Sequence, residues 1–352
     1  DEDQFRLASL APEPKRVSEH IPVEICTMVR DEDLFIIEWV EYHLMMGISH
    51  IHVYLHMSAD NTAALLDPYT RAGLVTLRSW DFNWSSMWMR FQSHAFNDCS
   101  LRRGASGNPV WLSILDVDEF LVPGYLNTSS RESSTLEEMV MSIPQALSQI
   151  VLDIGGENVN AVKLGWLMYT SKTGEVSEHI SEDQEPSHLT IDKFKWHRRE
   201  LMPRHENLVG DQMNGKVLIR ADMDVHVDFP GHKATIVPGG MFAGFPHVLH
   251  IAHYVGRARS YASSDSKQEA VASKRRTAIE EENPVRWKDN PLCFLSGRLE
   301  KHVCNRARSG DGFAGATNLC HSLQHFRSGR PKADGALLDV ESCLNSGQDG
   351  LF

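Results

Sequence analysis

Three carboxylates interrupt an apolar stretch, VWLSILDVDEFLVP, that occupies residues 110–123. The apolar run has the character of a buried strand, and Asp116, Asp118 and Glu119 follow it directly. Residues two apart in an extended chain point the same way, so Asp116 and Asp118 would face one rim. Like charges held together cost free energy unless a cation neutralises them, and Mg²⁺ or Mn²⁺ takes oxygen ligands and bridges to phosphates. The pair is therefore a candidate metal site against a diphosphate, although D-x-D alone is also typical of a solvated turn.

Strands and helices alternate around this motif. Apolar, β-prone runs predict strands at 23–29, 50–56, 74–80 and 110–115, and the intervening segments predict helices at 34–47, 61–73 and 88–102. This alternation predicts an α/β fold with a mostly parallel sheet flanked by helices. Ligands of such sheets bind beyond the carboxyl ends of the strands, where Arg30, Asp31, the segment 58–61 and the acidic motif would meet. No GxxxxGK[ST] motif is present, which excludes a P-loop enzyme.

The pattern changes after Gly124. Helices are expected at 135–147 and 263–274, and strands at 160–169, 215–227 and 248–254. A long polar stretch at 170–212 mixes Lys, His, Arg and Trp, so it is either a ligand-binding loop region or plain surface. The chain from residue 283 onward follows no pattern, and we expect a loop-rich C-terminal extension.

Composition excludes some classes of function. Acidic residues outnumber basic ones, 47 to 35, and the formal net charge of −12 is atypical of a nucleic-acid-binding protein. No apolar run is long enough to span a bilayer, and no signal peptide is present. The chain begins with Asp1 rather than Met, so we expect a truncated or processed form from which an N-terminal anchor could be missing.

The cysteines and two tripeptides favour an oxidising compartment. Four of the six cysteines lie between residues 293 and 343, in a part with few long apolar runs. No CxxC pair occurs, which argues against a zinc site, whereas disulfides that staple a loop-rich tail fit an oxidising environment. Asn83 and Asn127 each begin an N-glycosylation sequon, and each tripeptide alone is a weak signal. Together these features favour a secretory lumen.

A set of polar and aromatic residues resembles one known family in order and spacing. The set comprises Arg30, Glu32, Glu38, Trp39, Tyr42, His43, Gly47, Ser58, Asp60, Gln92, Asn97, Asp98, the LDVDEFLVP run, Lys163, Trp166, Lys216, Val217, Arg220, His232, His253 and Tyr254. Between Val23 and Lys274 it resembles glycosyltransferase family 92 and its family 2-like relatives. The resemblance implies a GT-A fold, which is a Rossmann-like, mostly parallel sheet that binds a nucleotide-sugar and a metal ion, without a covalent intermediate.

The resemblance also implies roles for individual residues. The donor-binding residues would be Arg30, Glu32, Asp60, Gln92, Asp98, Asp116 and Val117, with Asp60 near the nucleoside. The metal ligands would be Asp116, Asp118 and His253, with His232 as the alternative to His253. We prefer His253 because the run VLHIAHY reads as a strand that leads to the rim, yet either histidine is as readily explained as a structural one. Glu119 would orient the loop rather than bind metal.

Acceptor binding and proton transfer are the least defined by the sequence. Trp166 and Trp196, together with Tyr254, could stack on a sugar ring, although Trp166 equally fits a core position. An inverting transfer needs a base within hydrogen-bond reach of the acceptor hydroxyl. The first candidate for this base is Asp211, and the others are Asp222, Asp224 and Glu206. Relatives commonly carry Asn where this chain has Asp31, and Pro where it has Ala221. We therefore do not assign the acceptor specificity of the relatives to this chain.

The sequence as a whole predicts an inverting glycosyltransferase that depends on Mn²⁺ or Mg²⁺. By resemblance the donor is a UDP-sugar, with UDP-galactose favoured, and the acceptor is a glycan or polysaccharide. We expect the protein in the Golgi lumen or another secretory compartment, as the luminal part of a type II membrane protein. The expected units are a stem at 1–20, a catalytic domain at 21–275 with donor (21–125) and acceptor (126–275) halves, and an extension at 276–352. A catalytically inactive glycan-binding scaffold and a nucleotidyltransferase are the alternatives.

Overall fold

The computed structural model describes most of the first half of the chain and selected segments of the second. The described ranges are 21–81, 88–124, 140–154, 159–170, 189–190, 196–197, 215–222, 225–228, 233–236, 241–243, 248–254, 285–286, 292–310 and 312–329. No helix in these ranges is long and apolar enough to cross a membrane.

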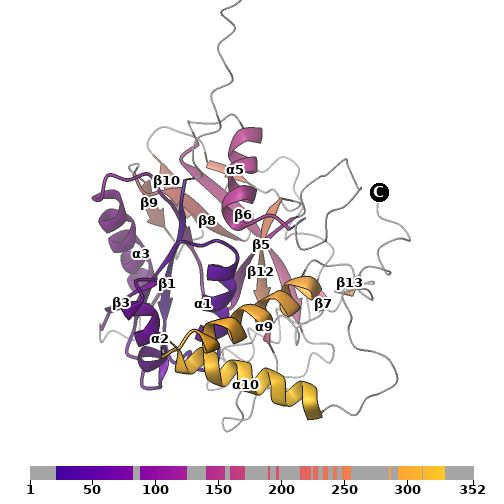
Figure 1. Ribbon diagram of the computed structural model, residues 1–352. Coiled ribbons are helices and arrows are strands. Elements are labelled where there is room, and N and C mark those ends of the chain that lie inside the picture. Colours follow the sequence, from indigo (N-terminus) through magenta and orange to yellow (C-terminus); the bar gives the residue numbers. More distant parts are fainter. Residues whose placement is uncertain are drawn as a thin grey trace, which may run out of the picture.

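One large mixed sheet organises the chain (Figure 1). Its parallel part consists, in spatial order, of β3 (Val75–Ser79), β2 (His50–Leu55), β1 (Val23–Val29) and β4 (Trp111–Ile114). β8 (Gly215–Arg220) runs antiparallel to both β4 and β6 (Ala161–Thr170) and joins them. β12 (Leu249–Tyr254) and β11 (Met241–Ala243) run parallel to β6, and β5 (Glu119–Pro123) runs antiparallel to β12. The predicted α/β fold class is confirmed.

Two short pairings complete the strands in these ranges. β7 (Trp196–His197) runs antiparallel to β6 and to β13 (Val285–Arg286). β9 (Val225–Asp228) and β10 (Lys233–Ile236) form a separate two-stranded sheet.

Helices cover both faces of the large sheet. They are α1 (Ile36–Met45), α2 (Thr62–Arg71), α3 (Trp88–Gly104), α5 (Ile143–Asp153), α9 (Leu292–Arg308) and α10 (Ala314–Gly329). Val23, Ile25 and Val29 of β1 pack into the larger core, to which all these helices except α3 contribute. Cys26 and Met28, which point to the opposite face, pack into a smaller core with α3. Cover on both faces explains why β1 is buried along its whole length.

The strands and helices predicted before residue 124 match the structure to within two residues at each end, whereas the sequence analysis does not predict β5. The helix predicted at 135–147 needs a correction, because in the described part of this segment α5 begins at Ile143 and continues to Asp153. Ser142 forms a capping box with the first turn, and Pro144 lies inside that turn, where its missing N–H leaves no hydrogen bond unmade.

The long strand predicted at 215–227 is interrupted. β8 ends at Arg220, and β9 begins only at Val225. The Arg220 guanidinium turns back onto the Asp222 carboxylate, with hydrogen bonds of 2.8 and 2.6 Å, and so fixes a turn at this point. The helix predicted at 263–274 lies outside the described residues.

The expectation of a loop-rich C-terminal part is wrong for residues 292–329. This segment forms α9 and α10, which run side by side (Figure 1) and which we call the C-terminal hairpin. Leu295, Leu299 and Val303 repeat every four residues and are buried. The sequence obscures this narrow apolar face because Gly297 and several polar residues lie between its members.

Two disulfides lie within the described residues. Cys304 on α9 bonds to Cys320 on α10 with Cα atoms 5.0 Å apart, which agrees with the predicted disulfide cross-linking of the C-terminal part. Cys26 on β1 bonds to Cys99 on α3 with Cα atoms 6.5 Å apart. The second bond ties a strand to the helix that covers it, and the sequence analysis, which concentrated on the clustered C-terminal cysteines, does not predict it.

A buried ion pair lies at the amino end of β1. Glu24, which is 6% exposed, accepts hydrogen bonds from Arg103 Nε at 2.6 Å and Arg103 Nη2 at 2.8 Å, and its Oε2 lies 2.8 Å from His52 Nε2. Burial alone would raise the pKa of Glu24, but His52 and Arg103 lower it from 4.5 to about 2.

Replacement of Glu24 by Gln should make the fold less sensitive to acid. The folded-state pKa of about 2 lies below the ordinary value of 4.5, so the carboxylate contributes its full stability above about pH 4.5 and loses it as the pH falls toward 2. The thermal midpoint of Glu24→Gln should be lower than that of the wild type at about pH 6 and should fall less steeply toward about pH 3. Scanning calorimetry at both pH values measures this, and equal slopes would contradict it.

Candidate functional site

Two loops follow neighbouring parallel strands at the rim of the sheet and are tied to each other. Asp31 lies two residues after β1 and Met57 two residues after β2, and both have left-handed φ angles, of 54° and 47°. The Asp31 N–H donates to Ser58 Oγ at 3.0 Å, and Asp31 Oδ1 accepts from the Ala59 N–H at 2.7 Å. Because a left-handed backbone is costly for residues other than glycine, these contacts are needed to hold the rim in this conformation.

Several predicted donor-binding residues lie in these two loops. Asp60 uses both carboxylate oxygens to accept backbone hydrogen bonds, from Asp33 at 2.8 Å and from Thr62 at 3.0 Å. The Glu32 N–H donates to Thr62 Oγ1 at 2.9 Å, and Arg30 is exposed at the same rim. Asp60 therefore links the two loops, while contact of these residues with a nucleoside stays a prediction.

The acidic turn, residues 116–118, connects β4 to β5. Asp116 accepts a hydrogen bond on each carboxylate oxygen, from Gln92 Nε2 of α3 at 2.6 Å and from Lys216 Nζ of β8 at 2.7 Å. Its backbone N–H donates to Glu119 Oε2 at 2.8 Å. The structure thus brings Gln92, a predicted donor-binding residue, to the acidic turn, and Asp116 fixes the turn to two neighbouring elements.

The charges beneath the acidic turn are buried. Lys216 and Glu119 are both fully buried, and Lys216 Nζ lies 3.9 Å from Glu119 Oε2. Burial disfavours the ammonium group, but the carboxylates of Asp116 and Glu119 outweigh this effect and raise the pKa of Lys216. Burial raises the pKa of Glu119 well above its usual range, and the two aspartates of the turn add to the rise. Lys216 therefore offsets part of the negative charge of the turn.

Helix α1 holds the strand that follows the turn through hydrogen bonds from side chains to backbone. The Trp39 indole N–H donates to the Glu119 carbonyl at 2.7 Å, and the Tyr42 hydroxyl donates to the Leu121 carbonyl at 2.8 Å. The Leu121 N–H donates to His43 Nε2 at 3.3 Å, so His43 Nδ1 carries the proton and donates to the Trp39 carbonyl at 2.8 Å. Three α1 side chains thus replace a neighbouring strand along one edge of β5.

Asp118, the last residue of the acidic turn, meets His253 of β12. Asp118 Oδ2 lies 3.3 Å from His253 Nε2, and the two side chains are only 11% and 7% exposed. The Asp118 carbonyl accepts a hydrogen bond from the Tyr254 N–H at 2.9 Å, which fixes the turn to β12. The Trp166 indole lies beside His253, with ring centroids 4.6 Å apart. The structure therefore brings together two predicted metal ligands and a predicted acceptor-binding residue.

The third predicted ligand is placed differently. Asp118 and His253 are adjacent, whereas both carboxylate oxygens of Asp116 accept hydrogen bonds from side chains of other elements. Within the described ranges, no group of three or more His, Cys, Asp or Glu side chains is arranged to hold a metal ion. The alternative ligand His232 lies outside those ranges, and the metal-binding role of the set stays a prediction.

The other predicted site residues are engaged elsewhere or not described. Asp98 of α3 accepts hydrogen bonds from Tyr54 Oη at 2.8 Å and Arg102 Nε at 2.7 Å; burial would raise the pKa of Asp98, but these partners lower it. Val117 is buried within the acidic turn, and of Trp196 only the backbone is described. The positions outside the described ranges are Asn83, Asn127, Glu206, Asp211 and Asp224.

Two residues of the site were assigned no role by the sequence analysis. The signal for Lys216 is its place at the start of the apolar run GKVLI, because a lysine that enters a buried strand needs an anionic partner. Glu38 of α1 accepts from both the N–H and the hydroxyl of Thr190, each at 2.7 Å. This contact anchors residues 189–190, which belong to the long polar stretch at 170–212, and the sequence offers no signal for it.

The solved structures that resemble this chain include two UDP complexes. S. aureus TarS 1–349 in complex with UDP has a TM-score of 0.35 at 11% identity, covering 89% of this chain and 93% of that one. Glucosyl-3-phosphoglycerate synthase from Mycobacterium tuberculosis, in complex with Mg²⁺ and UDP, has a TM-score of 0.28 at 10% identity, covering 74% and 81%.

Comparison of sequences identifies the family. A protein of Ricinus communis described as a glycosyltransferase family 92 protein is 32% identical over 105 residues, which cover 29% of this chain and 18% of that protein. One from Oryza sativa subsp. japonica is 31% identical over 97 residues, which cover 28% and 15%. The aligned part thus spans less than a fifth of the length of these curated relatives. The model of Glycosyltransferase family 92 matches residues 22–219, more than half of the chain, and the chain therefore belongs to glycosyltransferase family 92.

Proposed function

We propose that this protein is an inverting, metal-dependent glycosyltransferase that transfers galactose from UDP-galactose to a hydroxyl of a glycan or polysaccharide acceptor. The proposal includes Mn²⁺ or Mg²⁺ as the metal and the Golgi lumen, or another secretory compartment, as the site of action. Membership of family 92 supports glycosyl transfer. The single observation that carries the rest is the pairing of Asp118 with His253 at the end of the acidic turn.

The Asp118–His253 pair fits a divalent cation. Two ligand atoms that are each about 2.1 Å from one ion, at right angles to each other, lie about 3 Å apart. The separation of Asp118 Oδ2 and His253 Nε2 is 3.3 Å. Mg²⁺-type sites commonly use one or two protein ligands together with water and substrate phosphates, so a third protein ligand is not required. We therefore assign Asp118 and His253 as the metal ligands and Asp116 as the residue that positions the turn.

The charge of the turn also calls for a cation. Lys216 Nζ lies 2.7 Å from the Asp116 carboxylate and compensates its charge, whereas the Asp118 carboxylate lies beside His253. A diphosphate placed beside this carboxylate would be repelled unless a positive charge lay between them. When bound, a divalent ion offsets the charge that develops on the departing nucleoside diphosphate.

The structure describes fewer of the predicted acceptor-binding and base residues. The Trp166 ring beside His253 offers an aromatic face for a sugar next to the proposed metal ligands. Among the candidate bases, Asp222 is the one that the structure describes, and it is a poor base because two hydrogen bonds from Arg220 occupy its carboxylate and lower its pKa. Asp211 remains our candidate for the base that takes the acceptor proton.

Replacement of Asp118 by Asn should abolish metal-dependent nucleotide binding. At a 100-fold excess over Kd, UDP with Mn²⁺ should raise the thermal midpoint of the wild type by about 3–5 °C. Asp118→Asn keeps the shape of the side chain but removes the charge, so the shift should be lost together with galactosyl transfer. Differential scanning fluorimetry with a panel of UDP-sugars measures the shift and identifies the donor.

Asp67→Asn is the matched control for this experiment. Asp67 lies on the surface of α2, where its partner is Arg71, and the pair is 61% and 69% exposed. The control should bind and react as the wild type does. Full activity of Asp118→Asn would contradict the proposed mechanism. If no nucleotide-sugar shifted the thermal midpoint of the wild type, the result would favour a catalytically inactive glycan-binding scaffold.

Replacement of Lys216 by Met should destabilise the turn, and Asp116→Asn in the same chain should restore much of the loss. The single variant leaves the Asp116 carboxylate without its ammonium partner, so the free energy of unfolding should fall by about 2 kcal/mol. This is less than for a wholly buried pair because the Asp116 side chain is 35% exposed. A double-mutant cycle by denaturant unfolding gives the coupling, and strictly additive losses would show that the pair does not interact.

A further inference from the structure

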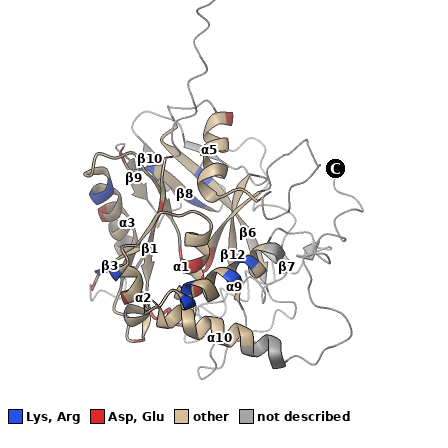
Figure 2. Cartoon of the chain, viewed as in Figure 1, with Lys and Arg blue, Asp and Glu red and all other residues tan. Residues whose placement is uncertain are grey.

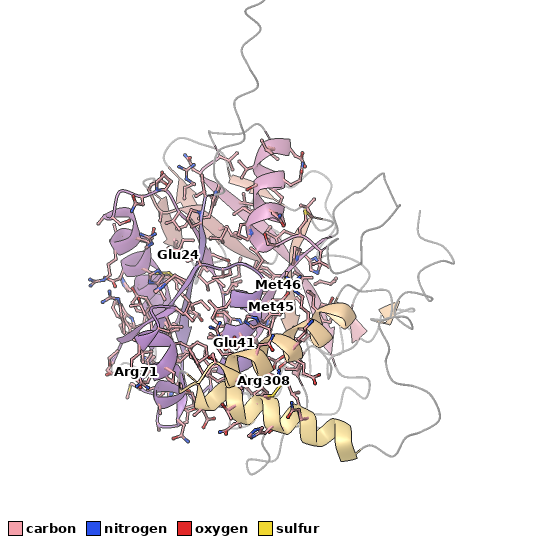
Figure 3. All side chains as sticks on the ribbon, viewed as in Figure 1. Glu24, Glu41, Met45, Met46, Arg71 and Arg308 are labelled. Carbon is pink, nitrogen blue, oxygen red and sulfur yellow. A yellow bond between two sulfur atoms is a disulfide. The ribbon has the colours of Figure 1, made fainter. Side chains whose placement is uncertain are left out.

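Glu41 is a fully buried carboxylate on α1 that faces the C-terminal hairpin rather than the sheet. The Tyr69 hydroxyl of α2 donates to its Oε1 at 2.6 Å. From α9, Arg306 Nε lies 3.1 and 3.3 Å from its two oxygens, and His302 Nε2 lies 3.0 Å from Oε2. Figure 2 shows the acidic patch of α1 beside the basic residues of α9, and Figure 3 labels Glu41 between these helices.

The hairpin is packed closely against α1 and α2 around this carboxylate. The Phe313 ring lies 4.9 Å from the Tyr69 ring, and the Arg306 guanidinium lies 5.2 Å from the centroid of Phe313. Gly315 of α10 approaches so closely that an added Cβ would be 2.8 Å from Ile37 Cγ1 of α1. The Cys304–Cys320 disulfide joins the two helices of the hairpin, so α9, which carries Arg306 and His302, is fixed to α10.

The same helix fixes the strand that carries the acidic turn. Within about one turn of α1, Glu41 points toward α9. The neighbouring Trp39, Tyr42 and His43 side chains form hydrogen bonds with the backbone of residues 119 and 121 in β5. A displacement of α1 would therefore move β5 or break these hydrogen bonds. Asp118 lies immediately before β5. Its position therefore depends on how α1 packs against the C-terminal hairpin.

We propose that the C-terminal hairpin positions the acidic turn, and that Glu41, held by Arg306 and adjacent to His302, is the residue through which it acts. The hairpin lies beyond residues 22–219, the part of the chain that matches the family model. Glu41 is a positioning residue, and its link to donor binding rests on the proposed function.

A variant series separates this positioning role from general stabilisation. Glu41→Gln removes the charge with little change of shape, and Glu24→Gln is its matched control. Glu24 is also a buried glutamate bound by an arginine and a histidine, but it lies on β1 beside α3 (Figure 3). Both variants should lower the thermal midpoint. Glu41→Gln alone should weaken binding of UDP with Mn²⁺, by about 5- to 20-fold, in calorimetry at a temperature where all variants are folded.

A second pair of variants tests the hairpin itself. Gly315→Ala places a methyl group against Ile37, whereas Gly297→Ala on α9 has no atom within 4 Å of the added Cβ. Gly315→Ala and the double variant Cys304→Ser/Cys320→Ser should weaken binding in the same direction as Glu41→Gln. Gly297→Ala should bind as the wild type does.

Hydrogen exchange gives a readout that needs no ligand. The Leu121 and Tyr254 amides donate to His43 and to the Asp118 carbonyl, so they report whether β5 and the turn are held. Their exchange should be faster in Glu41→Gln than in Glu24→Gln or the wild type. Unchanged exchange in Glu41→Gln would overturn the proposed positioning, whether or not the protein binds UDP. A wild type that fails to bind UDP, with the expected change in exchange, would overturn only the proposed function.

Discussion

A helix that is buried on all sides must find a partner for every polar side chain it carries, and α1 is such a helix. Eight consecutive residues, 36–43, are buried, and five of them are titratable or carry a polar ring atom in a hydrogen bond. Glu38 binds residues 189–190, Glu41 binds α9, and His43 binds β5. Since an unpartnered buried carboxylate is costly, these contacts hold three distant parts of the chain in fixed positions around one helix.

The acidic turn illustrates how such constraints place individual carboxylates. Asp116 lies between an amide from α3 and an ammonium from β8, and so its carboxylate is used to fix the backbone. Asp118 is left facing β12, where His253 lies. Two aspartates separated by one residue thus have different surroundings: Asp116 is bound by α3 and β8, and Asp118 lies beside β12. The difference is set by the partners that surrounding strands supply, not by the motif itself.

The local parts of this arrangement could be predicted from the sequence, and the long-range parts could not. Apart from β5, the strands and helices before residue 124 follow from apolar runs and from turn residues such as Gly47, whose φ is 92°. The carboxyl-end rule for parallel sheets predicts that the loops after β1, β2 and β4 lie at one rim, whereas Gln92 is assigned to the donor site only through the family resemblance. The contacts of Lys216 with Asp116 and of Glu41 with Arg306 join residues 100 and 265 positions apart. Which buried charges pair over such separations is decided by tertiary packing, which a single sequence does not display.

The way in which β5 is completed also bears on how the molecule behaves at high concentration. β5 pairs with β12 on one side, and an open backbone edge on its other side would be a template for adding a strand from another molecule. Indole, phenol and imidazole groups from α1 occupy the outward-facing groups of Glu119 and Leu121 instead. These side chains from inside the fold, together with Pro123, which ends β5 and has no N–H to donate, close the edge to intermolecular β-pairing.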